Sequence, residues 1–104
     1  MKRMEYLNRE EIINGLQQPL QTYINKYGID DIGIFEEEGQ DDRYYIGYTA
    51  SKGGKTYHIH APYKKNQDGR LAPAKNEWTV ETDEPNGEER HGYHDVESAF
   101  RELQ

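Results

Sequence analysis

The chain has 104 residues and a formal net charge of −7, and 33% of its residues are apolar and 32% charged. It contains no cysteine, which excludes disulfide bridges and thiolate metal sites, and no apolar run approaches the roughly 20 residues that a transmembrane helix needs. Nine tyrosines and one tryptophan supply buriable area, so we predict one folded, soluble, bacterial-type domain spanning residues 1–104, and expect it in the cytoplasm.

The N-terminal part of the chain has the pattern of a helix that starts after Asn8. Asn8 and Glu11 stand at the spacing of a capping box, in which side chains satisfy free backbone N–H groups of the first turn. Apolar residues then recur at helical spacing as far as Tyr27, and Gly28 is a typical C-terminal stop. Pro19 would press on the carbonyl four residues earlier, so the pattern predicts either a kink or two short helices in line.

Residues 32–37 form the first predicted strand, with Ile32 and Ile34 on one face. Residues 38–42 predict a turn that has Gly39 as its pivot. The acids of this stretch lack the regular ligand spacing of a calcium loop, so we expect them to form a solvated turn; they are Glu36, Glu37, Glu38, Asp41 and Asp42.

The stretch from Arg43 to Thr82 predicts a meander of three strands joined by two tight hairpins. The pair Gly53-Gly54 suits a type I′ turn, because that turn needs positive φ at both central residues. The turn fixes the register of the first hairpin and puts apolar partners on one face: Ala50 with Tyr57, Tyr48 with Ile59, and Ile46 with Ala61.

A second two-residue turn at residues 68–69 predicts the partners of the next hairpin: Tyr57 with Val80, Ile59 with Trp78, His58 with Thr79, and His60 with Glu77. Pro62 and Pro73 cannot donate to the hydrogen-bond ladder. Regular pairing is therefore expected to stop near Ala61 and resume near Asn76, with either a long loop or a continued hairpin between them.

The C-terminal part predicts a third turn, at residues 86–87, and a last helix. The turn would pair Val80 with Tyr93 and add a short strand, placing His91 near the apolar face. Asp95 is the expected N-cap of the helix, whose single apolar stripe consists of Val96, Ala99, Phe100 and Leu103.

These elements predict an α+β fold with the order α-β-β-β-β-α, or one further short strand. Both helices and the sheet have a single apolar face, so the simplest solution is a two-layer sandwich with both helices on one face of an antiparallel meander. This order resembles the double-stranded-RNA-binding domain in outline. That family has a lysine-rich start to its last helix, whereas Asp95 and Glu97 make the same place acidic here, so we do not expect its function.

The face of the sheet away from the helices is the predicted site of function. It is polar and is expected to lie in water, with the two histidines of a His-x-His pattern and a tyrosine available for contact. The chain has no G-x-S-x-G, P-loop or H-E-x-x-H pattern, so we predict a non-enzymatic, cofactor-free module that binds another protein or itself. The candidate interaction residues are Tyr45, Thr49, His58, His60, Glu77 and Thr79.

Two other binding functions are consistent with the sequence. A divalent metal or a small anion could be bound by His58, His60 and Glu77. A nucleic acid could be bound by residues 52–75, which hold six basic residues and one acid. We expect nucleic-acid binding less than metal or anion binding, because the basic residues fall at opposite ends of a strand about 26 Å long. The net negative charge of the chain also repels phosphate.

Overall fold

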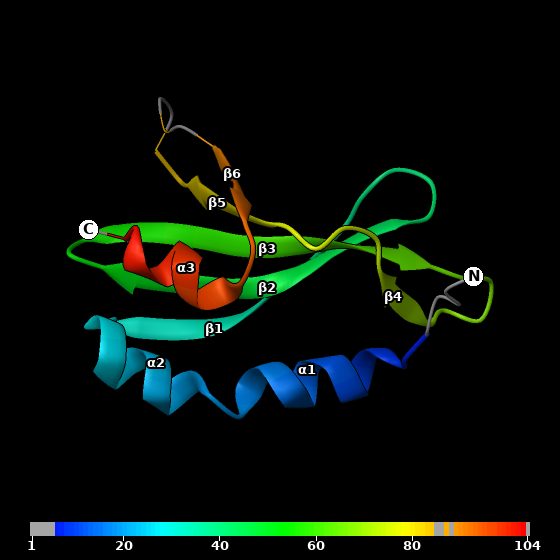
Figure 1. Cartoon of the computed structure of the whole chain (residues 1–104), viewed down its shortest axis with the longest axis horizontal. Coiled ribbons are helices and arrows are strands. Elements are labelled where there is room, and N and C mark those ends of the chain that lie inside the picture. The colour runs from blue at the N-terminus through cyan, green and yellow to red at the C-terminus, as the bar shows by residue number, and fades with distance from the viewer. Residues whose placement is uncertain (1–5, 85–86, 88, 104) are drawn as a thin grey trace.

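The structure is a computed structural model that describes residues 6–84, 87 and 89–103, and it has an α+β architecture (Figure 1). The helices are α1 (Arg9–Gln17), α2 (Leu20–Tyr27) and α3 (Val96–Arg101). The strands are β1 (Asp31–Glu38), β2 (Arg43–Lys52), β3 (Lys55–Lys65), β4 (Leu71–Pro73), β5 (Trp78–Thr82) and β6 (Arg90–Tyr93).

The strands form one antiparallel sheet in the order β1-β2-β3-β5-β6, with β4 paired to the end of β3. In Figure 1, α1 and α2 run alongside β1, and α3 lies in front of the sheet. The predicted α+β class is confirmed; β6 is the further short strand that the prediction allowed, and β4 is an additional one. At one edge of the sheet, β1 ends in three successive glutamates, from Glu36 to Glu38.

The first hairpin has the predicted turn and the predicted register. Gly53 and Gly54 have φ values of 59° and 80°, as a type I′ turn requires. The partners include Tyr48 with Ile59 and Ala50 with Tyr57. The glycine pair therefore determines which side chains of β2 and β3 face the helices.

The second hairpin reverses at the predicted place, but its turn is longer than two residues, since the Asn66 N–H donates to the Arg70 carbonyl and Lys65 pairs with Leu71. The register of β4 on β3 is therefore one residue from the predicted one, and that of β5 on β3 is two residues from it. The Asn66 side chain accepts hydrogen bonds from the backbone N–H groups of Asp68 and Arg70, at 3.0 and 2.9 Å, and closes β3 onto β4. Pro73 ends β4, and the irregular residues 74–77 separate it from β5.

Because the pairing restarts after this irregular segment, each residue of β3 has a different partner from the predicted one. Ile59 pairs with Val80 rather than Trp78, and His60 pairs with Thr79 rather than Glu77. Tyr57 and His58 pair with Thr82 and Glu81. Pairing also does not stop at Ala61, since β3 continues to Lys65 through Pro62, which lies opposite Tyr45.

The register of the last strand pair differs from the predicted one by three residues at Val80 and by two residues at Trp78. Val80 pairs with Arg90 and Trp78 pairs with Tyr93, with an irregularity between the two pairs. An odd shift turns side chains to the opposite face, so His91 lies on the face away from the helices and not near the apolar face. Of the predicted turn at residues 86–87, Asn86 lies outside the described residues.

Local capping signals in the helices act as predicted. The Asn8 side chain accepts from the Glu11 N–H at 2.9 Å, Asp95 caps α3, and Gly28 ends α2 with a φ of 63°. Pro19 separates the predicted helix into α1 and α2. The Leu16 carbonyl, left over at the end of α1, accepts from the buried Tyr48 hydroxyl at 2.8 Å.

The turn between β1 and β2 differs from the prediction in its pivot. Asp41, with a φ of 58°, takes the left-handed conformation that was expected of Gly39. Gly39 is instead required for space, because a Cβ atom there would lie 2.8 Å from a ring carbon of Tyr45. Asp is among the few residues that adopt this conformation readily.

The core lies between the helices and the face of the sheet that they cover. Tyr48, Ile59 and Phe100 are at most 1% exposed. The ring of Tyr23, from α2, contacts Phe100 and Tyr48 at centroid distances of 4.8 and 5.8 Å. Both terminal helical segments thus pack on one face of the sheet, as the two-layer prediction requires.

Candidate functional site

The candidate site is the uncovered side of the sheet, which we call the open face. It is formed by the side chains that point away from the helices, and alternation along the strands assigns five of the six predicted interaction residues to it. The sixth, Glu77, precedes β5 and lines the same hollow as Tyr45, His60 and Thr79. With three residues that were not predicted as interaction residues, Phe35, Glu81 and His91, the open face comprises Phe35, Tyr45, Thr49, His58, His60, Glu77, Thr79, Glu81 and His91.

His60 lies on the open face, but the prediction that it lies in water is wrong. It is only 9% exposed, although no helix covers it. The rings of Phe35 and Tyr45 flank it, each with a centroid distance of 5.4 Å. Its Nε2 atom lies 3.0 Å from a carboxylate oxygen of Glu81, and its Nδ1 atom is buried without a hydrogen-bond partner among the described residues.

Phe35 takes this position because Gly47 leaves space for it. The register places Gly47 between Phe35 and His60 across three strands. A Cβ atom at Gly47 would lie only 1.8 Å from the Ile59 carbonyl oxygen, so the position accommodates only glycine. The Phe35 ring reaches across the gap and also contacts His58, with a centroid distance of 4.9 Å. Alternation from Ile32 and Ile34 was the signal that could have assigned Phe35 to this face.

His58 is held on both of its ring nitrogens. Nδ1 lies 3.0 Å from the hydroxyl of Thr49, and Nε2 lies 2.6 Å from a carboxylate oxygen of Asp83. The predicted pairing of His58 with Thr79 is replaced by pairing with Glu81. His58 and His60 therefore interact with different carboxylates.

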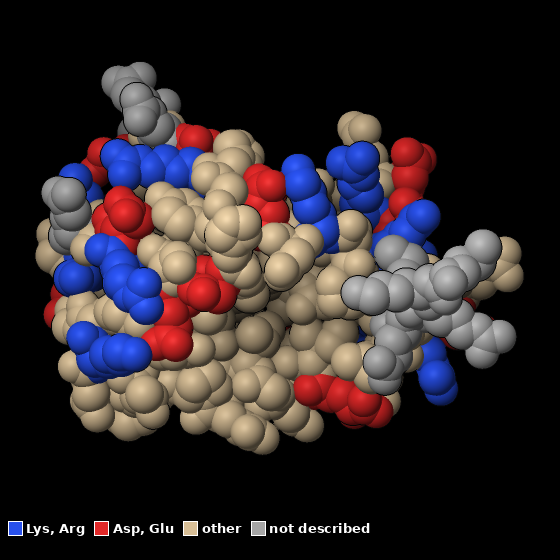
Figure 2. Space-filling model, viewed as in Figure 1, with Lys and Arg blue, Asp and Glu red and all other residues tan. Residues whose placement is uncertain are grey.

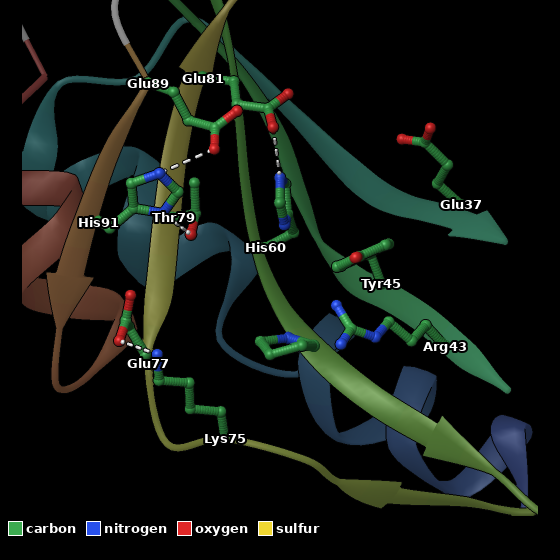
Figure 3. A pocket seen from close by; sticks show the side chains of 11 residues that line it. Glu37, Arg43, Tyr45, His60, Lys75, Glu77, Thr79, Glu81, Glu89 and His91 are labelled. Carbon is green, nitrogen blue, oxygen red and sulfur yellow. Dashed lines mark hydrogen bonds and ion pairs between the residues drawn. The ribbon is translucent and has the colours of Figure 1, made fainter. Parts of the chain in front are cut away.

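His91 adds a third histidine to the open face. Its Nδ1 atom lies 3.1 Å from the hydroxyl of Thr79, and its Nε2 atom lies 2.8 Å from a carboxylate oxygen of Glu89. Figure 3 shows the carboxyl groups of Glu81 and Glu89 close together at one end of this group. The chain of contacts runs from His60 through the two carboxyl groups to His91.

The two carboxyl groups differ in their affinity for a proton. Hydrogen bonding with Glu81, followed by burial, raises the pKa of Glu89. Burial also acts to raise the pKa of Glu81, but hydrogen bonds from His60 and Glu89 outweigh it, so the pKa of Glu81 is lowered. Two adjacent carboxylates repel each other, and Glu89 is the member of the pair that binds a proton more readily.

A hollow of about 440 Å³ lies on the open face, bordered by Tyr45, His60, Thr79, Glu81, Glu89 and His91 among others (Figure 3). Its charged lining consists of four carboxylates and two cations, namely Glu37, Glu77, Glu81, Glu89, Arg43 and Lys75. Lys75 forms an ion pair with Glu77 at 3.1 Å. The hollow is therefore a polar site of small-ligand size with an excess of negative charge.

The metal ligands predicted from the sequence do not converge. Glu77 interacts with Lys75, while His58 and His60 interact with Asp83 and Glu81. Within residues 6–84, 87 and 89–103, no three His, Asp or Glu side chains are arranged to hold a metal ion.

The acidic stretch around the end of β1 is largely exposed, as predicted: Glu37, Glu38, Asp41 and Asp42 all lie at the surface. Glu36 is half-buried; it forms an ion pair with Arg9 of α1 and accepts a hydrogen bond from the Tyr44 hydroxyl at 2.9 Å. Glu38 interacts with Lys65 at 2.8 Å. These two contacts tie the edge of the sheet to its neighbours.

The basic residues of segment 52–75 are separated in space. Lys52 and Lys55 lie at the Gly53-Gly54 hairpin, and Lys64 and Lys65 lie opposite the start of β2 or beyond it. On the side of the molecule that Figure 2 shows, Lys and Arg side chains gather at two separate places, each beside Asp or Glu. The structure offers no single basic patch there for a phosphate backbone.

Comparison with known proteins places the chain in a family but gives it no activity. None of the helices in the described part of the chain has the length and apolar character that a membrane crossing requires. No curated protein matches the chain. Residues 6–103 match the family described as "Family of unknown function (DUF5634)". Because the match covers nearly the whole chain, this protein belongs to that family of unknown function.

Proposed function

We propose that this protein is a non-enzymatic binding module that holds a protein partner on the open face of its sheet. The observation that carries this proposal is the arrangement of Phe35, Tyr45 and His60, whose rings pack together on a face that no helix covers. A face that met only water would need no such group of rings. The absence of cysteine fits a role in the reducing cytoplasm.

The open face also has the composition of an interaction surface. Interfaces commonly combine an aromatic centre with a polar rim. Here the rings are surrounded by carboxylates, and the hollow of about 440 Å³ provides a concave feature into which a partner could fit.

The face is ordered before any partner arrives. His58 is fixed by Thr49 and Asp83, and His91 by Thr79 and Glu89. Side chains that are already fixed lose little conformational entropy on binding. These histidines of the open face are therefore preorganised for binding.

Gly33 allows this proposal to be tested without damage to the fold. It lies on the open face opposite Thr49, and a Cβ atom there would meet no other atom within 4 Å. Gly33→Tyr adds a bulky, uncharged side chain to the face, and its Cβ atom has no clash with the rings. Gly15 of α1 is also free of contacts at its Cβ position, so Gly15→Tyr is the matched control away from the open face.

The experiment compares what the wild type and both variants retain from a native lysate, and it measures their self-association by sedimentation. We expect a partner, or a second copy, to be held by the wild type and by Gly15→Tyr and to be lost from Gly33→Tyr, with similar melting temperatures for all three. Equal retention by Gly33→Tyr and the wild type would refute a docking site on this face.

A further inference from the structure

We propose that the partner presents an arginine or lysine side chain, and that the cationic group of this side chain enters the hollow beside Glu81 and Glu89. This inference rests on the proposed function, because it assumes that the open face is where a protein docks. It goes further by stating the chemistry of the residue that the partner must supply.

The charge balance of the hollow supports a cation. Glu77 is already neutralised by Lys75 at 3.1 Å. The remaining charged lining is Glu37, Glu81 and Glu89 against Arg43. In the described part of the chain, Glu37 and Arg43 form no side-chain ion pair, while Glu81 and Glu89 lie 3.0 and 2.8 Å from the ring nitrogens of His60 and His91. With both imidazoles neutral, two negative charges remain in excess. An acidic partner would be repelled from this place.

The contact between Glu81 and Glu89 gives the cation a specific position. Two adjacent carboxylates repel each other unless something positive lies between them. Hydrogen bonding with Glu81 and burial raise the pKa of Glu89, as expected for two carboxyl groups in contact. A guanidinium or ammonium group between them can relieve this repulsion and donate to both carboxylates at once.

The rings of the open face suit the remainder of such a side chain. Arginine and lysine have apolar stems that pack on apolar surfaces, and their cationic groups are attracted to aromatic faces. Tyr45 and His60 both line the hollow, and Phe35 lies against His60. A metal ion would need several converging ligands, and no three His, Asp or Glu side chains converge to hold one within the described residues.

The test uses a short blocked peptide of glycine and serine with one central arginine. The matched probe has citrulline at the same position, because citrulline is nearly isosteric with arginine but uncharged. Binding is followed by backbone amide shifts in NMR spectra of the full chain. We expect the arginine peptide to shift the amides of Thr79, Glu81 and His91, and the citrulline peptide to leave them unchanged.

Charge variants locate the interaction. Glu89→Gln keeps a hydrogen-bonding group but removes the charge, and it should weaken binding of the arginine peptide about tenfold. Glu10→Gln makes the same change on α1, away from the open face, and should leave the affinity unchanged. Equal weakening by both variants would show a general charge effect and would overturn the proposed position.

The outcomes separate this inference from the function on which it rests. If Gly33→Tyr abolishes docking but the arginine peptide causes no local shifts, the proposal of a docking site is supported. The inference that the partner supplies a basic residue is then refuted. If the free amine agmatine binds as tightly as the peptide while Gly33→Tyr retains every partner, the hollow is a small-amine site and the protein partner is refuted.

Discussion

The two faces of the sheet bury large side chains in different ways. On the covered face, Tyr48 and Phe100 are at most 1% exposed because a layer of helices lies over them. On the open face, His60 is 9% exposed although no second layer covers it. Its cover is made by neighbouring side chains of the same face, chiefly Phe35, Tyr45 and Glu81.

Because of this difference, we expect the two faces to contribute unequally to folding stability and to the proposed binding. The covered face buries apolar area, which is the main source of folding free energy. The open face holds its rings through ring contacts and through hydrogen bonds of the histidines, and Phe35 and Tyr45 stay partly exposed. We therefore expect substitutions on the covered face to affect unfolding most, and substitutions on the open face to affect binding most.

The largest expected difference is between two phenylalanines. Phe100→Ala should lower the free energy of unfolding by about 4 kcal/mol, since it removes a fully buried ring that contacts Tyr23, Tyr27 and Tyr48. Phe35→Ala should cost about 1 to 2 kcal/mol, because its ring is only partly buried. Urea titrations measure both values, and equal losses would mean that the open face contributes to stability as much as the core does.

A smaller difference is expected between two tyrosines that lose only their hydroxyl groups. Tyr48→Phe leaves the Leu16 carbonyl without its donor at the end of α1 and should cost about 1 kcal/mol. Tyr45→Phe should cost nothing measurable, because its hydroxyl donates no hydrogen bond within the described part of the chain. The midpoints of denaturant unfolding would be compared, and a loss in Tyr45→Phe would point to a polar contact on the open face.

The smallest expected effect concerns the ion pair that ties α1 to β1 and depends on pH. The hydrogen bond from Arg9, opposed in part by burial, lowers the pKa of Glu36. A lowered folded-state pKa stabilises the protein above the ordinary glutamate pKa of about 4.3, and this stabilisation is lost as the pH falls through the folded value. Arg9→Met should therefore melt slightly below the wild type at neutral pH.

That gap in melting temperature should close as the medium is acidified below the ordinary glutamate pKa. Met keeps much of the apolar stem of arginine, so the comparison isolates the charge. A gap of the same size at neutral and acid pH would assign the effect to packing of the stem instead.

The sequence allowed the face of most strand residues to be predicted more reliably than their partners. Residues 74–77 shift the β3–β5 register by two positions, so Ile59 keeps its face but exchanges Trp78 for Val80. The β5–β6 register is shifted by three residues at the Val80–Arg90 pair, which moves the neighbouring His91 to the other face. Turn residues determine register only while pairing continues without interruption, and no local signal showed how long these interruptions would be.

The same limit applies to the candidate site. The assignment of His58 and His60 to one face follows from alternation alone, and five of the six predicted residues lie there on strands. The burial of His60 depends on Phe35 reaching across Gly47, and the carboxylate pair depends on the β5–β6 register. Both are contacts between distant segments, and neither is encoded in the spacing of one strand.

The glutamates at the end of β1 also bear on how this protein behaves when it is concentrated. An edge strand has free hydrogen-bonding groups and can pair with the same strand of another molecule. In a symmetric antiparallel pairing of two β1 strands about Ile34, Asp31 of each copy would lie opposite Glu37 of the other, on the same face. Like charges in that position are unfavourable, so this edge strand opposes dimerisation through its own copy.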